Sequence, residues 1–150
     1  CTAATCKTNG YRGLIEKRGA VAANNSWGML NDLPTNALKF EMDSTASAEV
    51  VNAIADDTPA IYCVISSTGN LLSSYVNGQA GPSVGKTMMS GSNSDRLVVG
   101  ARFDLASSYY GQIGEVFVMS KDASAAERRI AECYLSAKFS IPLVGGAVCP

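Results

Sequence analysis

Histidine is absent from the 150-residue chain, and its absence excludes several kinds of active site and metal site. Without an imidazole, the chain cannot form a Ser–His or Cys–His nucleophile pair or a zinc site with histidine ligands. The five cysteines include no Cys-x-x-Cys pair, so the usual spacing of a zinc finger is missing too. These residue types favour a protein that is not an enzyme.

An excess of one charge and long apolar runs are missing as well. Twelve basic residues stand against 13 acidic ones, and no run of Lys or Arg is long enough to follow a phosphate backbone. No stretch reaches the roughly 18 apolar residues that a membrane helix needs. We therefore expect neither a nucleic-acid partner nor a membrane span. The chain starts at Cys1, as a processed or excised product would, and a removed leader would fit export.

The cysteines fit a protein that is exported and carries disulfides, at an extracellular location or on a cell or virion surface. Any four of them allow three connectivities, and the sequence does not choose among these. The fifth is left for an intermolecular bond, lipidation or a free thiol. The disulfide candidates are Cys1, Cys6, Cys63, Cys133 and Cys149.

Short apolar segments separated by Gly, Asn, Asp, Ser and Pro fill residues 11 to 120, which is typical of antiparallel β structure in a sandwich or barrel. The cleanest half-buried strand is Leu38–Asp43, where apolar and charged residues alternate. One domain is expected over 1–150, with 1–10 as an N-terminal segment. The expected strands are Leu14–Lys17, Trp27–Leu30, Leu38–Asp43, Glu49–Ile54, Ala60–Ser66, Leu71–Asn77, Arg96–Ala101 and Gln112–Met119.

A single helix is predicted over 123–139, followed by a tail over 143–150. Ser124 and Glu127 have the spacing of a capping box, in which each side chain bonds the other residue's backbone N–H. Ile130, Cys133, Tyr134 and Ala137 share one face of this helix. We expect that face to pack against the β structure.

Three stretches carry a resemblance to a known superfamily. They are Ala60–Ile65 with the hairpin sequence Tyr75-Val76-Asn77-Gly78-Gln79, then Arg96–Arg102 with Tyr110–Val118, then Ser124–Arg129 with Tyr134–Phe139. Together they resemble the concanavalin A-like lectin/glucanase superfamily, in particular laminin-G-like domains. The resemblance implies an all-β fold, an antiparallel two-sheet β-sandwich of the jelly-roll type with one short C-terminal α-helix.

The opening strand that many members carry before a segment like Gly13–Lys17 is not evident. Either the first ten residues supply it or a neighbouring chain does. In the second case an open sheet edge would invite strand addition from a partner.

Two sequence features could be mistaken for catalytic or nucleotide-binding motifs. Ala80–Thr87 matches a relaxed phosphate-binding loop, but a poor helix follows it and no parallel α/β alternation surrounds it, so we interpret it as a plain loop. The E-x-D-x-E acid cluster of related glucanases is absent. Lone Glu115 is interpreted as a structural acid that pairs with an arginine of the helix.

Loop residues are the candidates for ligand binding. Laminin-G-like relatives often bind calcium or glycans at the sandwich rim, which makes Asn93, Asp95 and Asp104 candidate oxygen ligands. Turn chemistry explains the same three residues without a ligand. Tyr109 and Tyr110 follow Ser107-Ser108 and are expected to be surface aromatics. No cofactor is expected, with calcium as the alternative.

The leading hypothesis is a non-catalytic extracellular recognition or adhesion module that binds a glycan or a surface protein through loops of a β-sandwich. The alternative is a structural subunit or decoration protein of a surface filament, appendage or virion. In that role the chain would form homo-oligomers or contact a neighbouring subunit through strand addition or an intermolecular disulfide.

Overall fold

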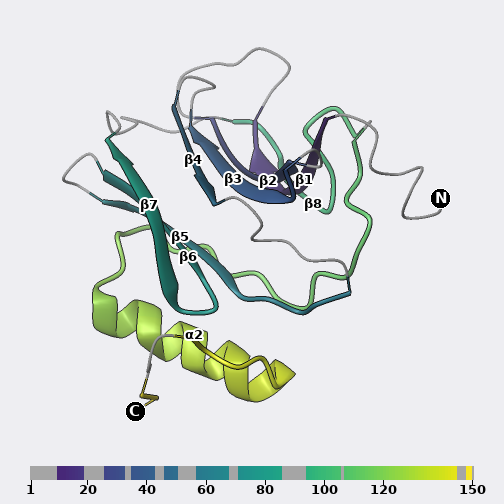
Figure 1. The fold of residues 1–150 in the computed structure, drawn as a ribbon. Coiled ribbons are helices and arrows are strands. Elements are labelled where there is room, and N and C mark those ends of the chain that lie inside the picture. Colours follow the sequence, from purple (N-terminus) through teal and green to yellow (C-terminus); the bar gives the residue numbers. More distant parts are fainter. Residues whose placement is uncertain are drawn as a thin grey trace. The chain divides into compact units, whose positions relative to one another are not determined.

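The computed structural model describes residues 10–18, 26–32, 35–42, 46–50, 57–67, 71–85, 94–105, 107–144 and 148–149. The chain divides into two compact units (Figure 1). Unit 1 comprises Cys1–Ala55 with Met89–Phe117, and unit 2 comprises Asp56–Met88 with Val118–Pro150. Each unit contains one antiparallel sheet, and the chain's described helix belongs to unit 2. The predicted all-β fold class, with two antiparallel sheets and one C-terminal helix, is confirmed.

Unit 1 contains a five-stranded sheet in the order β4-β3-β2-β1-β8. The first four strands follow one another as antiparallel neighbours, and β8 joins the free side of β1. A register shift between Gly13 and Ile15 interrupts the β1–β2 ladder. The strands are β1 Tyr11–Lys17, β2 Trp27–Asp32, β3 Ala37–Met42, β4 Ala46–Val50 and β8 Leu97–Val99.

The alternation predicted for Leu38–Asp43 is present over Leu38–Glu41 of β3, but the charged face of this strand is also largely covered. Leu38 is buried on one face. On the other face, Lys39 and Glu41 form an ion pair with a nitrogen–oxygen distance of 2.8 Å, and both side chains are mostly shielded from solvent. The sheet therefore carries a polar network on the face that the sequence predicts to be wet.

Unit 2 contains a three-stranded sheet in the order β5-β6-β7, made of β5 Tyr62–Ser67, β6 Leu71–Val76 and β7 Gln79–Gly85. Asn77 and Gly78 form the turn between β6 and β7, and both have positive φ angles, as a two-residue hairpin turn requires. Strand β7 covers most of the sequence that resembles a phosphate-binding loop. The interpretation of 80–85 as a plain loop is thus wrong, and Pro82 is accommodated because β7 is an edge strand.

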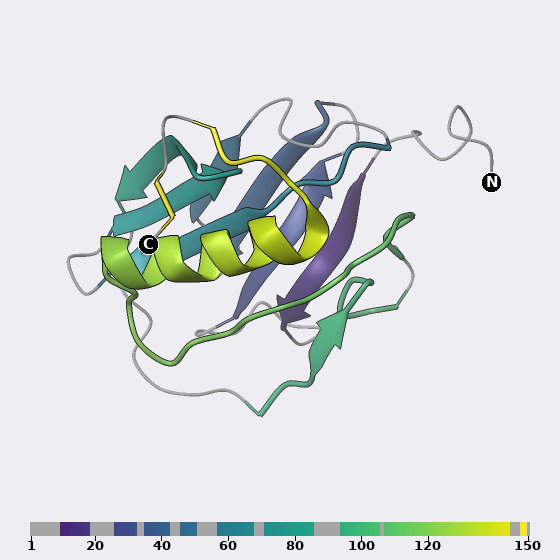
Figure 2. The same ribbon diagram turned by 90° about the horizontal axis from the view of Figure 1, so that it is seen from below.

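Helix α2 spans Ala125–Phe139 and begins with the predicted capping box. The Glu127 N–H donates to Ser124 Oγ at 3.2 Å, and the Ser124 N–H donates to Glu127 Oε2 at 2.9 Å. The helix lies along one face of the β5–β7 sheet of its own unit (Figure 2). Within the described part of the chain, no helix is long and apolar enough to cross a bilayer.

The predicted packing face of this helix is wrong. Ile130 and Tyr134 are 57% and 46% exposed, whereas Glu132 is 2% exposed. Arg128 stacks on Tyr75 of β6, with its guanidinium carbon 3.8 Å from the ring centroid. The helix thus turns Arg128 and Glu132 toward the sheet, together with half-buried Leu135, and leaves Ile130 and Tyr134 exposed to solvent.

The predicted strand Gln112–Met119 is also wrong, because none of these residues, all of them described, belongs to a strand. The segment has strand-forming residues but joins neither of the two described sheets, and its apolar residues Val116–Met119 are exposed. The fourth predicted strand, Glu49–Ile54, overlaps β4, which spans Ala46–Val50. Residues 51–56 lie outside the described part.

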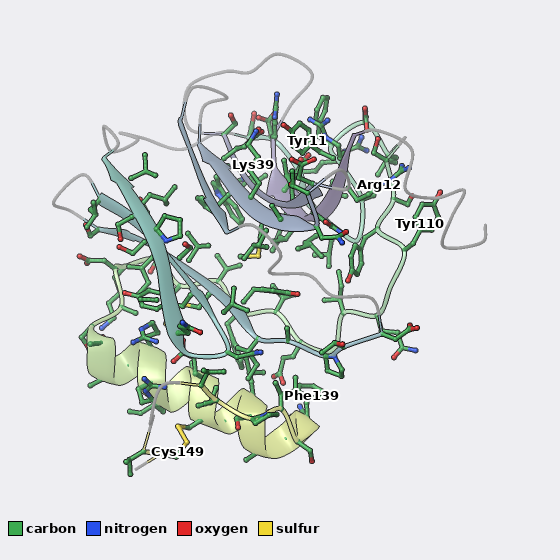
Figure 3. The ribbon with its side chains drawn as sticks, viewed as in Figure 1. Tyr11, Arg12, Lys39, Tyr110, Phe139 and Cys149 are labelled. Atoms are coloured by element: carbon green, nitrogen blue, oxygen red, sulfur yellow. A yellow bond between two sulfur atoms is a disulfide. The ribbon has the colours of Figure 1, made fainter. Side chains whose placement is uncertain are left out.

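Cys133 and Cys149 form a disulfide, with an S–S distance of 2.05 Å and a Cα–Cα distance of 5.6 Å. The bond attaches the described end of the chain to the middle of α2; Cys149 is labelled in Figure 3. Cys63 of β5 is free, and burial raises the pKa of its thiol to about 11. It therefore stays protonated at neutral pH, as a packed thiol does. Cys1 and Cys6 lie outside the described residues.

Candidate functional site

Three of the predicted site residues, Asp104, Tyr109 and Tyr110, lie in one segment that crosses β1 of unit 1. We call residues 100–111 the 100–111 loop. Its ends are attached by backbone hydrogen bonds, from the Gly100 N–H to Leu14 O at 2.9 Å and from the Tyr109 N–H to Gly100 O at 2.8 Å. Ser108 forms isolated bridges with both Gly13 and Ala101. The rigid sheet thereby positions the loop, which is how binding residues are commonly presented.

Gly13 allows the loop to approach β1 closely. A Cβ atom on Gly13 would lie 2.2 Å from the carbonyl oxygen of Ala101 and 2.6 Å from the Arg102 nitrogen. Because these neighbours are backbone atoms, no side-chain rotation can relieve the clash. A residue with any side chain at position 13 would therefore displace the loop.

A buried carboxylate, Glu16 of β1, holds the loop at its centre. The side chain is 1% exposed and accepts a hydrogen bond from the Phe103 N–H at 2.8 Å. Its other oxygen lies 3.4 Å from Arg102 Nε, an ion pair without a hydrogen bond. A Cβ atom on Gly28 would lie 2.8 Å from Glu16 Cγ, so the glycine in β2 gives this side chain its room.

Cations surround the Phe103 ring on this loop. The guanidinium carbons of Arg18 and Arg102 lie 5.1 and 5.5 Å from the ring centroid, within the range of a cation–π interaction. Arg18 also pairs with Glu41 of β3 at 3.2 Å. The polar network of the sheet thus continues into the loop and fixes its middle.

The pH dependence of stability should reveal the burial of Glu16. Burial raises the pKa of this carboxyl group, although the Phe103 N–H and the charges of Arg102 and Arg18 oppose the rise. The folded state therefore holds the proton more tightly than the unfolded state does. The stabilisation from Glu16 is complete below the unfolded pKa and is lost as pH rises through the folded pKa. We expect wild type to lose stability relative to Glu16→Gln over that window, measured by urea unfolding at a series of pH values.

Glu127 is a matched control with the opposite sign. Its hydrogen bonds with Lys121 and Ser124 lower the pKa of this carboxyl group to about 2, so its contribution is present above the unfolded value and is lost on acidification. The difference in free energy of unfolding between wild type and Glu127→Gln should therefore stay constant as pH rises above the unfolded pKa. A flat difference for Glu16→Gln as well would contradict the raised pKa of Glu16.

The loop displays one aromatic ring to solvent. Tyr110 is 58% exposed, and the guanidinium carbon of Arg12 lies 5.1 Å from its ring centroid (Figure 3). Neighbouring Tyr109 is half-buried, and burial raises the pKa of its hydroxyl group. Leu105 is exposed and adopts a positive φ of 61°, which is strained for a leucine. Of the two predicted surface aromatics, the structure therefore exposes Tyr110 and half-buries Tyr109.

The other predicted ligand residues do not form a cluster with metal-binding geometry in the described structure. Asn93 lies outside the described residues, Asp104 is exposed on the loop, and Asp95 accepts a hydrogen bond from Lys17 Nζ through its backbone oxygen at 2.6 Å. Within the described ranges, no group of three or more Cys, Asp or Glu residues could hold a metal ion. Calcium binding by Asn93, Asp95 and Asp104 stays a prediction.

Sequence reasoning missed Arg12, Glu16 and Arg102 as parts of this site. A signal for Glu16 was present, because the acid lies in an otherwise apolar strand start, Gly13-Leu14-Ile15. Arg12 gave no such signal, since only the fold brings it to Tyr110. Glu115, the acid that the sequence singled out, is half-buried.

Comparisons with known proteins identify no family for this chain. No family model matches it, and no curated protein matches it either. One solved structure is similar, that of an S-layer domain-containing protein from Clostridium thermocellum ATCC 27405, at 14% identity and a TM-score of 0.40. The match covers 83% of this chain, which spans 64% of that one. A similarity this low carries no argument about function, and the resemblance to laminin-G-like domains gains no support from a family match.

Proposed function

We propose that this chain is a non-catalytic extracellular recognition module that binds a glycan through the 100–111 loop, with Tyr110 as the stacking platform. The observation that carries the proposal is the exposed ring of Tyr110, oriented by Arg12 on a loop that the sheet holds in place. The face of an aromatic ring is negative, and it attracts the weakly positive C–H groups of a sugar ring.

Preorganisation favours this loop as a binding site. When the tyrosine is already fixed, binding a ligand does not carry the entropy cost of ordering its side chain. More of the contact free energy therefore appears as affinity. The Gly13 approach and the Glu16–Phe103 hydrogen bond supply that order here. The strained Leu105 is a further feature that loops at functional sites often share.

The extracellular location is supported by the Cys133–Cys149 disulfide. Disulfides persist in oxidising compartments and are rare where glutathione and thioredoxin keep thiols reduced. The absence of histidine from the sequence supports a role without nucleophilic catalysis.

Replacement of Tyr110 should test the proposed site. The protein is screened against an array of defined oligosaccharides, and the best-retained one is titrated by calorimetry with and without calcium. We expect Tyr110→Ala to bind about tenfold more weakly, which corresponds to a loss of about 1.4 kcal/mol. Loss of binding in EDTA would show that the site requires calcium.

The matched control is Phe139→Ala, which removes an exposed aromatic ring from unit 2. This variant should bind the oligosaccharide as wild type does. The proposal fails if the array retains no oligosaccharide, or if Tyr110→Ala binds as tightly as wild type.

A further inference from the structure

Helix α2 turns a buried ion pair toward the sheet that it covers and leaves its two largest outward residues, Ile130 and Tyr134, exposed. Its inward side carries Arg128 and Glu132, whose side chains are 10% and 2% exposed. Its outward side carries four exposed, uncharged residues that lie one helical turn apart. We call them the outward stripe: Ala126, Ile130, Tyr134 and Ala137.

This arrangement is unfavourable for an isolated helix on a sheet. An amphipathic helix gains stability when its apolar face leaves water, and α2 instead buries charges and leaves Ile130 and Tyr134 exposed. Single exposed apolar residues need no explanation, but a continuous stripe on one helix face is typical of an interaction surface. The small Ala126 and Ala137 at its ends would let another helix approach closely.

We propose that the outward stripe pairs with the same stripe of a second copy of this chain, with the two helices antiparallel. The stripe is self-complementary in this direction. With the two-fold axis at residue 132, Ile130 faces the partner's Tyr134, and Ala126 faces the partner's Lys138. The pairing buries the two large apolar residues of each helix against each other.

The charges at the two ends of α2 favour the antiparallel direction and a copy of the same chain. At the N-terminal end, Asp122 and Glu127 outweigh Lys121, and Lys138 lies in the last turn. The two residues after Glu127, Arg128 and Arg129, are directed to Glu132 and not to the outward stripe. Antiparallel pairing brings each acidic end to the partner's Lys138 and also aligns the helix dipoles favourably. Parallel pairing would place like charges together.

The disulfide extends the same surface. Cys133 lies beside Ile130 and Ala137 on the helix, and its bond to Cys149 brings the end of the chain to the edge of the stripe. Val148, next to Cys149, is 85% exposed. The oxidised tail therefore adds an apolar side chain to the surface that the partner would cover.

Sedimentation velocity of the full chain tests the pairing without any glycan, so its outcome is independent of the proposed function. Over about 1 to 200 µM, we expect the dimer fraction to rise with concentration, as mass action requires. Ile130→Glu and Tyr134→Glu should each weaken dimerisation at least about tenfold, because a charge would be buried in the contact. Leu71→Glu, at a residue of unit 2 that is 42% exposed, should leave it unchanged. Unchanged circular dichroism would show that the variants fold.

Disulfide trapping tests the direction. In the antiparallel register, Ala126→Cys protein mixed with Lys138→Cys protein should give a cross-linked dimer on oxidation, whereas neither alone should. The two copies of residue 126 would be about 18 Å apart along the axis, far beyond the roughly 7 Å that a disulfide spans. Wild type treated in the same way controls for its own cysteines. A chain that stays monomeric at every concentration, glutamate variants that dimerise as wild type, or cross-linking of Ala126→Cys alone would overturn the proposal.

Discussion

Gly13→Ala is expected to destabilise the protein by about 3 kcal/mol, the upper end of what overpacking a well-packed site costs. The added methyl group would lie 2.2 Å from the Ala101 carbonyl oxygen, so either β1 or the 100–111 loop must move. The loop is the weaker of the two, because it is held by isolated bridges, whereas β1 has ladders on both sides. Urea unfolding measures the loss of stability. Calorimetry with the selected oligosaccharide measures the displacement of Tyr110.

Gly85→Ala is the control for this substitution. Gly85 is the last residue of β7, and a Cβ atom there would meet nothing within 4 Å. Since alanine restricts the unfolded chain more than glycine does, Gly85→Ala should be neutral or stabilising by up to about 1 kcal/mol. If Gly13→Ala unfolds at the same urea concentration as wild type, the close approach of the loop to β1 is refuted.

The sequence predicts the local elements of this fold better than their partners. Alternation within Leu38–Glu41, the Asn77-Gly78 turn and the capping box at Ser124 depend on neighbouring residues, and all three occur in the structure. Gln112–Met119 has equally good local features but forms no strand, because a strand also needs a ladder partner that lies elsewhere in the chain.

Helix α2 shows the same limit at the level of packing. Helical period correctly places Ile130, Tyr134 and Ala137 on one face, but it does not say which face meets the sheet. That choice depends on Tyr75, which lies about 50 residues away and stacks with Arg128. For the same reason, the sequence identified only some residues of the candidate site. Tyr110 could be selected from its loop sequence, whereas Arg12, which orients it, could not.

Removal of the Glu132 carboxylate is expected to lower the free energy of unfolding by about 3–5 kcal/mol, as is usual when one partner of a buried ion pair is removed. Glu132 is 2% exposed, and both of its oxygens accept hydrogen bonds from Arg128 Nη1, at 2.7 and 2.6 Å. Arg129 Nη1 lies 3.4 Å from the same carboxylate. In Glu132→Leu, two guanidinium groups would keep their positive charge beside the sheet without a counter-charge. Circular dichroism during urea unfolding follows the loss through the signal of α2.

A double variant separates the charge from the packing. Arg128→Met with Glu132→Leu removes the hydrogen-bonded pair and leaves a thioether against the Tyr75 ring, a favourable contact. Arg129 keeps its charge in this variant, but its side chain is 24% exposed and can reach solvent. Replacing a buried pair with apolar residues is often neutral or stabilising, so the double variant should recover most of the stability that Glu132→Leu alone loses. Equal losses in the two variants would mean that the shape of the Glu132 side chain, and not its charge, holds the helix. Recovery would show that the charged residues on the inward side of α2 are stable only when they neutralise one another. Rotating the helix to bury Ile130 and Tyr134 would then separate both arginines from their counter-charge.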